Sequence, residues 1–219
     1  MSDLPVIRFY VYDTFSEIFF YKINDDEYKV MIDKVNKVSE SLGQAIKEVS
    51  GVDFLRIAKK FSEIKKKDYA IEYTTLFFTG LGFKPLMPVE SRRTFAISGE
   101  KQALRQYLDI TSFYERRGVV PKVTGSFIHE PDHITTILAF MALLVREEIE
   151  ERKEGKDFLK TVKEESEFLN RHVVNWVIDW ARDVMSDPRA NLFKVVCEEL
   201  AKWIEFDYRE ISKVLPKVV

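Results

Sequence analysis

The chain has 219 residues, of which 46% are hydrophobic and 32% are charged, a composition typical of a folded domain and not of a disordered segment. Its 34 basic and 36 acidic side chains give a net charge of −2, so there is no basic excess for binding a nucleic-acid backbone. The single cysteine, Cys197, cannot form an internal disulfide, and no apolar stretch reaches the roughly 18 residues of a membrane span. Because the N-terminus also lacks the pattern of a secretory signal, we expect a cytoplasmic protein.

Apolar residues recur at three- and four-residue spacing along most of the chain, which predicts helices. The first helix is expected over residues 5–22. A second begins at Asn24, whose side chain can cap a helix that starts with acidic residues. A third is expected over residues 52–64, and a short fourth helix follows to about Phe78, where a glycine ends it.

The stretch GLGFKPLMPVESRRTF, which begins at Gly80, contains several glycines and prolines and predicts a long loop near residues 80–98. Long ordered loops in compact domains often carry function. Further helical patterns cover residues 100–116, 131–149, 157–184 and 189–211. Residues 1–219 are therefore predicted to form one all-α domain, a helical bundle.

The sequence HEPDH, which begins at His129, matches the H-E-x-x-H pattern of zinc hydrolases. Such a site needs both histidines on one face of a continuous helix. Pro131 is unfavourable inside a helix by about 3 kcal/mol, but it suits the first helical position. We therefore expect the helix to begin at Pro131, with Glu130 at the cap and with Asp132 and His133 in the first turn. His129 then precedes the helix, which argues against a zinc site.

The same residues have a second interpretation. An aspartate and a titratable histidine at a helix start, next to a long loop, can hold a basic or polar group of a bound peptide. A simple helix cap is the alternative. It accounts for Pro131 and Asp132 better than for His133.

Four stretches together resemble a known family. EPDHITTILAFMALL (130–144) resembles the signature of the TorD/DmsD/NarJ redox-enzyme maturation chaperones, a Glu-Pro-(x)-Asp-His start followed by an apolar helix. EYTTLFFTG (72–80) is similar to the aromatic and Leu-Phe stretch of the family, and PLMPVESRR (85–93) to its proline-rich loop. FLNRHVVNWVIDWARDV (168–184) resembles the His-x-x-x-Trp helix of the family.

This resemblance implies a cytoplasmic all-helical chaperone of the TorD-like type, with no catalytic activity, no cofactor and no metal of its own. Members of the family bind the twin-arginine leader of a molybdenum- or tungsten-containing reductase, and hold back its export until cofactor insertion is complete. By matching position, the residues expected to line or shape the leader site are Tyr73, Leu76, Phe77, Pro88, Glu90, Ser91, Pro131, Asp132 and His133.

A leader has an arginine pair and an apolar run, so its receptor needs carboxylates beside an exposed apolar groove. Glu90 and Asp132 are candidate acceptors for the guanidinium groups. The candidates for the apolar run are Leu76, Phe77 and Met87. Two alternatives stay open. Leu76 and Phe77 can be ordinary core residues, and Glu90 can be neutralised internally by Arg92 or Arg93.

The chain departs from the family pattern at three places: one residue of the signature is missing between Pro131 and Asp132, Ile137 stands where many members carry glutamate, and Val89 stands where an aromatic residue is common. These departures affect the expected contacts and the identity of the client more than the expected role. A helical adaptor without leader recognition and an H-E-x-x-H zinc hydrolase are the alternative functions. The sequence allows a monomer or a dimer.

Overall fold

A computed structural model describes residues 4–120 and 130–215 of the chain. Every regular element in these ranges is helical, which confirms the predicted all-α fold class. The α-helices are α1 (Leu4–Phe19), α2 (Asp25–Ser50), α3 (Phe54–Ser62), α4 (Lys66–Thr74), α5 (Glu90–Ser98), α6 (Glu100–Arg116), α7 (Ile134–Lys153), α8 (Leu159–Leu169), α9 (Val177–Ser186) and α10 (Leu192–Val214). The π-helical turns η1 (Thr75–Thr79) and η2 (Asn170–Val174) extend α4 and α8.

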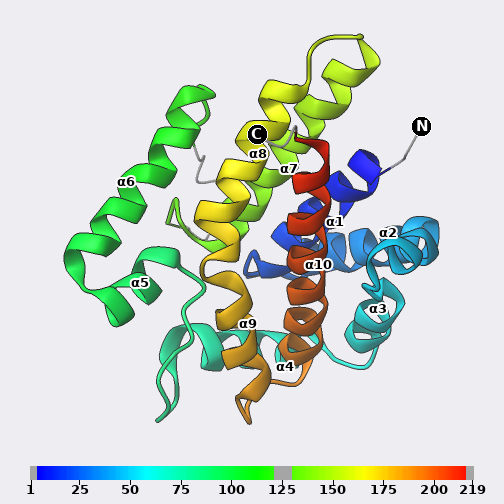
Figure 1. Cartoon of the computed structure of the whole chain (residues 1–219). Coiled ribbons are helices and arrows are strands. Elements are labelled where there is room, and N and C mark those ends of the chain that lie inside the picture. Colours follow the sequence, from blue (N-terminus) through cyan, green and yellow to red (C-terminus); the bar gives the residue numbers. More distant parts are fainter. Residues whose placement is uncertain (1–3, 121–129, 216–219) are drawn as a thin grey trace.

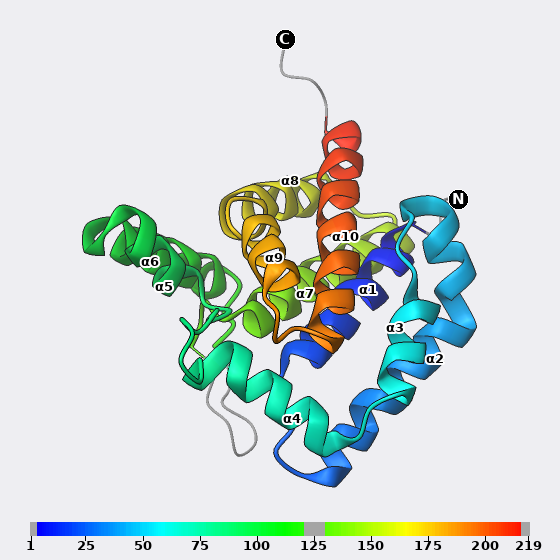
Figure 2. The same ribbon diagram turned by 90° about the horizontal axis from the view of Figure 1, so that it is seen from below.

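The centre of the bundle is formed by α1 and α7, which pack along each other, and by the adjacent pair α9 and α10 (Figure 1). On one side of this centre lies the pair α2 and α3, and on the opposite side lies the pair α5 and α6 (Figure 2). The α5–α6 hairpin projects away from the rest of the bundle (Figure 2), and four of its large apolar side chains, Phe95, Ile97, Leu104 and Leu108, are exposed.

The core contains a cluster of aromatic side chains from five elements. Its members are Phe19, Tyr73, Phe77, Trp180 and Phe193. Burial of each such ring contributes about 1.5–3 kcal/mol to the stability of the fold, and contacts between tilted ring pairs add to this. Cys197 is also fully buried, and burial raises the pKa of its thiol well above the usual range.

The predicted start of the second helix is confirmed at atomic detail. Asn24 Oδ1 accepts a hydrogen bond from the Glu27 N–H at 2.8 Å, and the Glu27 carboxylate accepts one from the Asn24 N–H. This reciprocal pair is a capping box, which local sequence specifies completely. The helix ends at Ser50, and its C-cap Gly51 has a φ of 76°, in the left-handed region that favours glycine.

The predicted loop near residues 80–98 extends too far. The non-helical segment ends at Val89, and α5 covers Glu90–Ser98. The apolar side chain of Val89 cannot cap this helix. Instead, the Asp132 carboxylate accepts a hydrogen bond from the Ser91 N–H at 2.8 Å. Because the capping residue lies far along the chain, the loop sequence itself did not reveal the helix start.

Helix α7 begins later than predicted, at Ile134 and not at Pro131. Its N-cap is His133, whose Nδ1 accepts a hydrogen bond from the Thr135 N–H at 3.2 Å. Pro131 lies in a turn before the helix. The expected placements were therefore wrong for Pro131, Glu130, Asp132 and His133.

The helical pattern over residues 157–184 is divided into α8, η2 and α9. Trp176 interrupts it with a φ of −145°, and its indole N–H donates to the His172 carbonyl at 2.8 Å. The last helix starts at Leu192 instead of about residue 189.

The start of α10 also depends on a distant carboxylate. Glu72 of α4 accepts hydrogen bonds at 2.8–3.0 Å from three consecutive backbone N–H groups, those of Asn191, Leu192 and Phe193. A negative charge is stabilising at the N-terminus of a helix, so Glu72 fixes where α10 begins.

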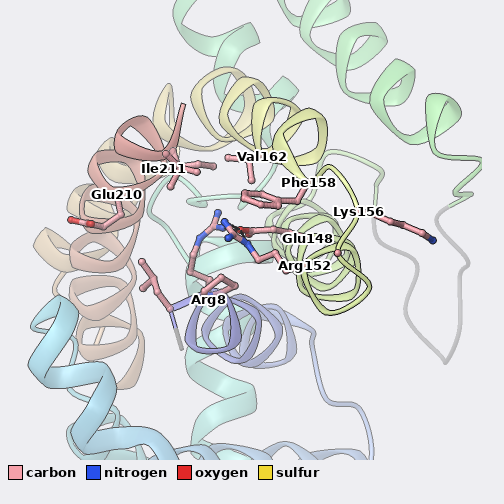
Figure 3. Close-up of a pocket in the computed structure, with 12 residues that line it drawn as sticks. Arg8, Glu148, Arg152, Lys156, Phe158, Val162, Glu210 and Ile211 are labelled. Atoms are coloured by element: carbon pink, nitrogen blue, oxygen red, sulfur yellow. Dashed lines mark hydrogen bonds and ion pairs between the residues drawn. The ribbon is translucent and has the colours of Figure 1, made fainter. Parts of the chain in front are cut away.

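A buried group of charged side chains joins α1, α7, α8 and α10. The Arg8 guanidinium donates to Asp207 at 2.6 and 3.3 Å and to Glu148 at 2.8 Å, and it lies 2.7 Å from a Glu165 oxygen. Arg8 and Glu148 also line a pocket of about 680 Å³, together with Arg152 (Figure 3). Since paired buried charges are costly to separate, this group fixes the relative placement of four helices.

Candidate functional site

Six of the predicted site residues meet at one place, where the end of the loop meets the segment before α7. We call this place the signature junction; its members are Pro88, Glu90, Ser91, Pro131, Asp132 and His133. Val89 and His133 form an isolated antiparallel bridge. The Ile134 N–H donates to the Pro88 carbonyl at 2.8 Å, and the Glu90 N–H donates to the Asp132 carbonyl at 3.1 Å. The fold therefore brings together two segments that are about 40 residues apart.

Asp132 is buried at this junction. One carboxylate oxygen caps α5 through Ser91, as described above, and the Tyr114 hydroxyl donates to the neighbouring Pro131 carbonyl at 2.8 Å. Burial raises the pKa of Asp132, while the Ser91 hydrogen bond opposes this. The carboxylate thus faces the N-terminus of α5 and not solvent.

Glu90 is also buried, but its partners are not the arginines that the sequence suggested. Its Oε2 lies 2.9 Å from His172 Nδ1, and its Oε1 accepts a hydrogen bond from Asn175 Nδ2 at 3.1 Å. On the other side, His172 Nε2 lies 2.9 Å from Asp109 Oδ2. Burial raises the pKa of Glu90, and the hydrogen bond from His172 opposes the rise.

The Glu90–His172–Asp109 chain connects α5, η2 and α6. Both ring nitrogens of His172 face a carboxylate oxygen, so the ring is held between Glu90 and Asp109. The ring is fully buried and packs edge-on against Phe113. This chain anchors the projecting α5–α6 hairpin to the bundle, and sequence reasoning missed Asp109 as its third member.

The remaining predicted residues, Tyr73, Leu76 and Phe77, are fully buried. The Tyr73 hydroxyl donates to the Phe19 carbonyl at 2.7 Å. The Leu76 carbonyl accepts a hydrogen bond from the Leu86 N–H at 2.8 Å, which attaches the proline-rich loop to η1. In this structure these three side chains belong to the core that supports the loop.

An exposed groove lies beside the signature junction. We call it the α5 groove. It has a volume of about 760 Å³ and is lined by residues 84–87 of the loop, by residues 92, 93 and 95–97 of α5, and by Trp180 and Asp183 of α9. Phe95 and Ile97 are 58% and 72% exposed, so their apolar side chains are available to a partner. Most of these residues were not predicted, although Met87 was. The apolar residues of 95–97 could have indicated an exposed binding surface, because they lie between polar stretches and continue no core pattern.

The loop that forms one wall of the groove is held by its own contacts. Gly80 has a φ of 70°, and a Cβ there would lie 1.9 Å from the Phe83 carbonyl oxygen. The Arg189 guanidinium donates to the Gly80 carbonyl at 2.8 Å, and the Trp180 indole N–H donates to the Leu86 carbonyl at 2.9 Å. The wall is thus fixed before any partner arrives.

Within residues 4–120 and 130–215, no three His, Cys, Asp or Glu side chains are grouped so that they could hold a metal ion. His129, the first histidine of the H-E-x-x-H match, lies outside the described residues. His133 precedes α7 as its cap, so the helix that a zinc hydrolase requires does not contain it. In the same described ranges, none of the helices has both the length and the apolar character needed to cross a membrane.

Comparison with known proteins gives one family and one fold. Residues 34–182 match the family described as nitrate reductase delta subunit. No curated protein matches the sequence significantly. Among solved structures, the chain is similar to a candidate redox enzyme maturation protein from Archaeoglobus fulgidus, with a TM-score of 0.57 and 17% identity over 90% of this chain and 93% of that one. At this identity the likeness establishes a common fold.

Proposed function

This chain belongs to the nitrate reductase delta subunit family of redox-enzyme maturation chaperones, which are not enzymes, and we propose that it binds the leader of its client. The client is a molybdenum- or tungsten-containing oxidoreductase subunit with a twin-arginine leader. Binding takes place in the cytoplasm, on the apo-form of the subunit, and it delays export until the cofactor is inserted.

The observation that carries this proposal is the α5 groove beside the signature junction. A leader contains an apolar run, and an apolar segment binds most favourably where side chains are exposed around a preformed hollow. Phe95, Ile97 and Met87 offer such side chains, and the loop wall is already fixed. Pro88, Ser91, Pro131 and His133 are proposed to shape the site, and Tyr73, Leu76 and Phe77 to support it from the core.

The first test is a pull-down of the tagged chain from lysate of its own source organism, followed by mass spectrometry. Recovery of a metal-containing reductase subunit that still carries its leader supports the proposal and identifies the client. If the recovered proteins all lack such leaders, the proposal is wrong, and a helical adaptor is the better description.

The second test locates the binding surface. A fluorescent peptide of the client leader is titrated in an anisotropy assay against Ile97→Glu, and we expect at least tenfold weaker binding because a carboxylate then enters the apolar groove. Val30→Glu is the matched control, since Val30 is 62% exposed on α2, on the other side of the bundle. Equal loss in both variants would show that the groove is not the leader site.

A further inference from the structure

The chain contains its own arginine pair followed by apolar residues. The first turns of α5 read Ser91-Arg92-Arg93-Thr94-Phe95-Ala96-Ile97. This is the chemistry that defines a twin-arginine leader, namely two adjacent guanidinium groups followed by apolar side chains. The same segment forms one wall of the α5 groove, so a leader-like sequence lies at the place proposed for the leader.

Both arginines of this segment are held by carboxylates that lie outside α5. Arg92 Nη2 is 2.8 Å from Glu130 Oε1, in the segment before α7. Arg93 Nη1 is 2.7 Å from Asp183 Oδ2, in α9. The side chains of Glu130 and Asp183 are 41% and 50% exposed, whereas Glu90 and Asp132 are buried. Glu130 and Asp183 are therefore the carboxylates that a bound peptide can reach.

Because of the charge of the groove, the arginine pair of a peptide cannot bind there while Arg92 and Arg93 keep their present places. Among the residues that the structure describes, Lys84, Arg92 and Arg93 line it together with one carboxylate, that of Asp183. A second pair of guanidinium groups would meet a cationic wall and be repelled. The repulsion disappears if the incoming pair takes over the two carboxylates and the resident arginines turn into solvent.

Such an exchange is energetically accessible. Exposed ion pairs are weak because water and salt screen both charges. The Arg92 side chain is 62% exposed, so it can turn outward without disturbing the core. The Arg93 side chain is only 19% exposed, and its release depends on the 50% exposure of its partner Asp183. The incoming groups are guanidinium groups too, so the carboxylates regain the same kind of hydrogen bond that they lose.

We propose that Glu130 and Asp183 are the acceptors for the arginine pair of the leader, and that Arg92 and Arg93 occupy them in the free chaperone as an internal mimic. This inference rests on the proposed function and names the contact that selects arginine. The mimic also sets a threshold, because only a segment with both an arginine pair and an apolar run gains enough to displace it.

The test is a peptide titration by fluorescence anisotropy at fixed salt. It uses a leader peptide with its natural arginine pair and the same peptide with two lysines. In Arg92→Gln/Arg93→Gln the carboxylates are vacant, so we expect the arginine peptide to bind about three- to tenfold more tightly than it binds the wild type. In Glu130→Gln/Asp183→Asn we expect weaker binding and loss of the preference for arginine over lysine.

The matched control is Asp179→Asn, because Asp179 is an exposed carboxylate on the same helix as Asp183 that pairs with Arg182 instead of α5. It should leave both affinities unchanged. The inference is overturned if the Arg92→Gln/Arg93→Gln variant binds the arginine peptide no more tightly than the wild type does. If the wild type binds arginine and lysine peptides equally, the inference about the arginine acceptors and the internal mimic is wrong, while the proposed docking of the apolar run stands. If no leader peptide binds any variant, the proposed function fails as well.

Discussion

The buried charged group around Arg8 gives a prediction about pH. One guanidinium is shared by three carboxylates, and Asp207 and Glu148 accept its hydrogen bonds. Glu165 is fully buried and lies 2.7 Å from the guanidinium, but neither of its oxygens accepts a hydrogen bond within the described part of the chain. Burial, with the nearby charges of Glu148 and Asp207, raises the pKa of Glu165 to about 8, although Arg8 opposes this. Burial therefore favours the protonated form of Glu165 in the folded state relative to the unfolded chain.

The sign of the pH effect follows from this raised pKa. The folded state holds the Glu165 proton more tightly than the unfolded state, whose carboxyl has the ordinary pKa of 4.5. The stability that results is fully present below about pH 4.5 and is lost as the pH rises to about 8. At 1.36 kcal/mol per pH unit, the upper limit of the loss is about 5 kcal/mol. Because Arg8 can turn toward an ionised Glu165, we expect about 2–3 kcal/mol.

The perturbation is Glu165→Gln, which has the shape of the protonated side chain but cannot ionise. Urea denaturation of the variant and the wild type at about pH 5.5 and about pH 9 measures the difference in unfolding free energy at each pH. Taking this difference cancels the titration of groups that do not interact with Glu165. We expect the variant to gain about 2–3 kcal/mol relative to the wild type between the two pH values. A difference that does not change with pH would show that Glu165 stays ionised in the folded protein, and would refute the reasoning.

Three further predictions concern backbone and caps. Gly80→Ala should lower the unfolding free energy by more than about 2 kcal/mol, because the added Cβ meets the Phe83 carbonyl. Gly82 has a similar φ of 88° but open space around it, so Gly82→Ala should lower the unfolding free energy by only about 1 kcal/mol in the same urea assay. Equal losses would mean that the backbone angle alone matters. Asn24→Ala removes the capping box and should lower the unfolding free energy by about 1 kcal/mol; an unchanged urea midpoint would contradict that role. Asp132→Ala removes the cap of α5 and should lower the unfolding free energy by about 1–2 kcal/mol. It should also weaken the binding of arginine and lysine leader peptides by the same factor. A change in their ratio would show direct contact.

The outcome at the helix starts shows what local sequence can specify. The start at Asn24 was predicted correctly because every group of its capping box lies within four residues. The start of α5 was not predicted and that of α10 was placed too early, because their caps, Asp132 before α7 and Glu72 of α4, come from distant segments of the chain. Periodicity identified the helices themselves, since the apolar face needed for the core repeats locally.

The site was harder to predict for a related reason. A sequence shows that Glu90 is a carboxylate near a loop, but not that His172 of η2 and Asn175, which follows η2, will surround it. The resemblance pointed to six residues that the structure places together at the signature junction. It could not distinguish those that build the junction from those that reach solvent, because that depends on which side chains the fold covers.

This difference assigns separate roles to the acidic residues. The Glu90 carboxylate has its hydrogen bonds inside the protein, and the Asp132 carboxylate caps α5 through one oxygen while its other oxygen is buried. An incoming guanidinium could therefore reach either group only by opening the anchor or the cap of α5. Such a loss would leave buried polar groups without partners, at about 1–3 kcal/mol each. Glu130 and Asp183 can change partners at the surface for much less. The buried pair therefore positions α5, and the exposed pair is the one suited to exchange its arginines for those of a client.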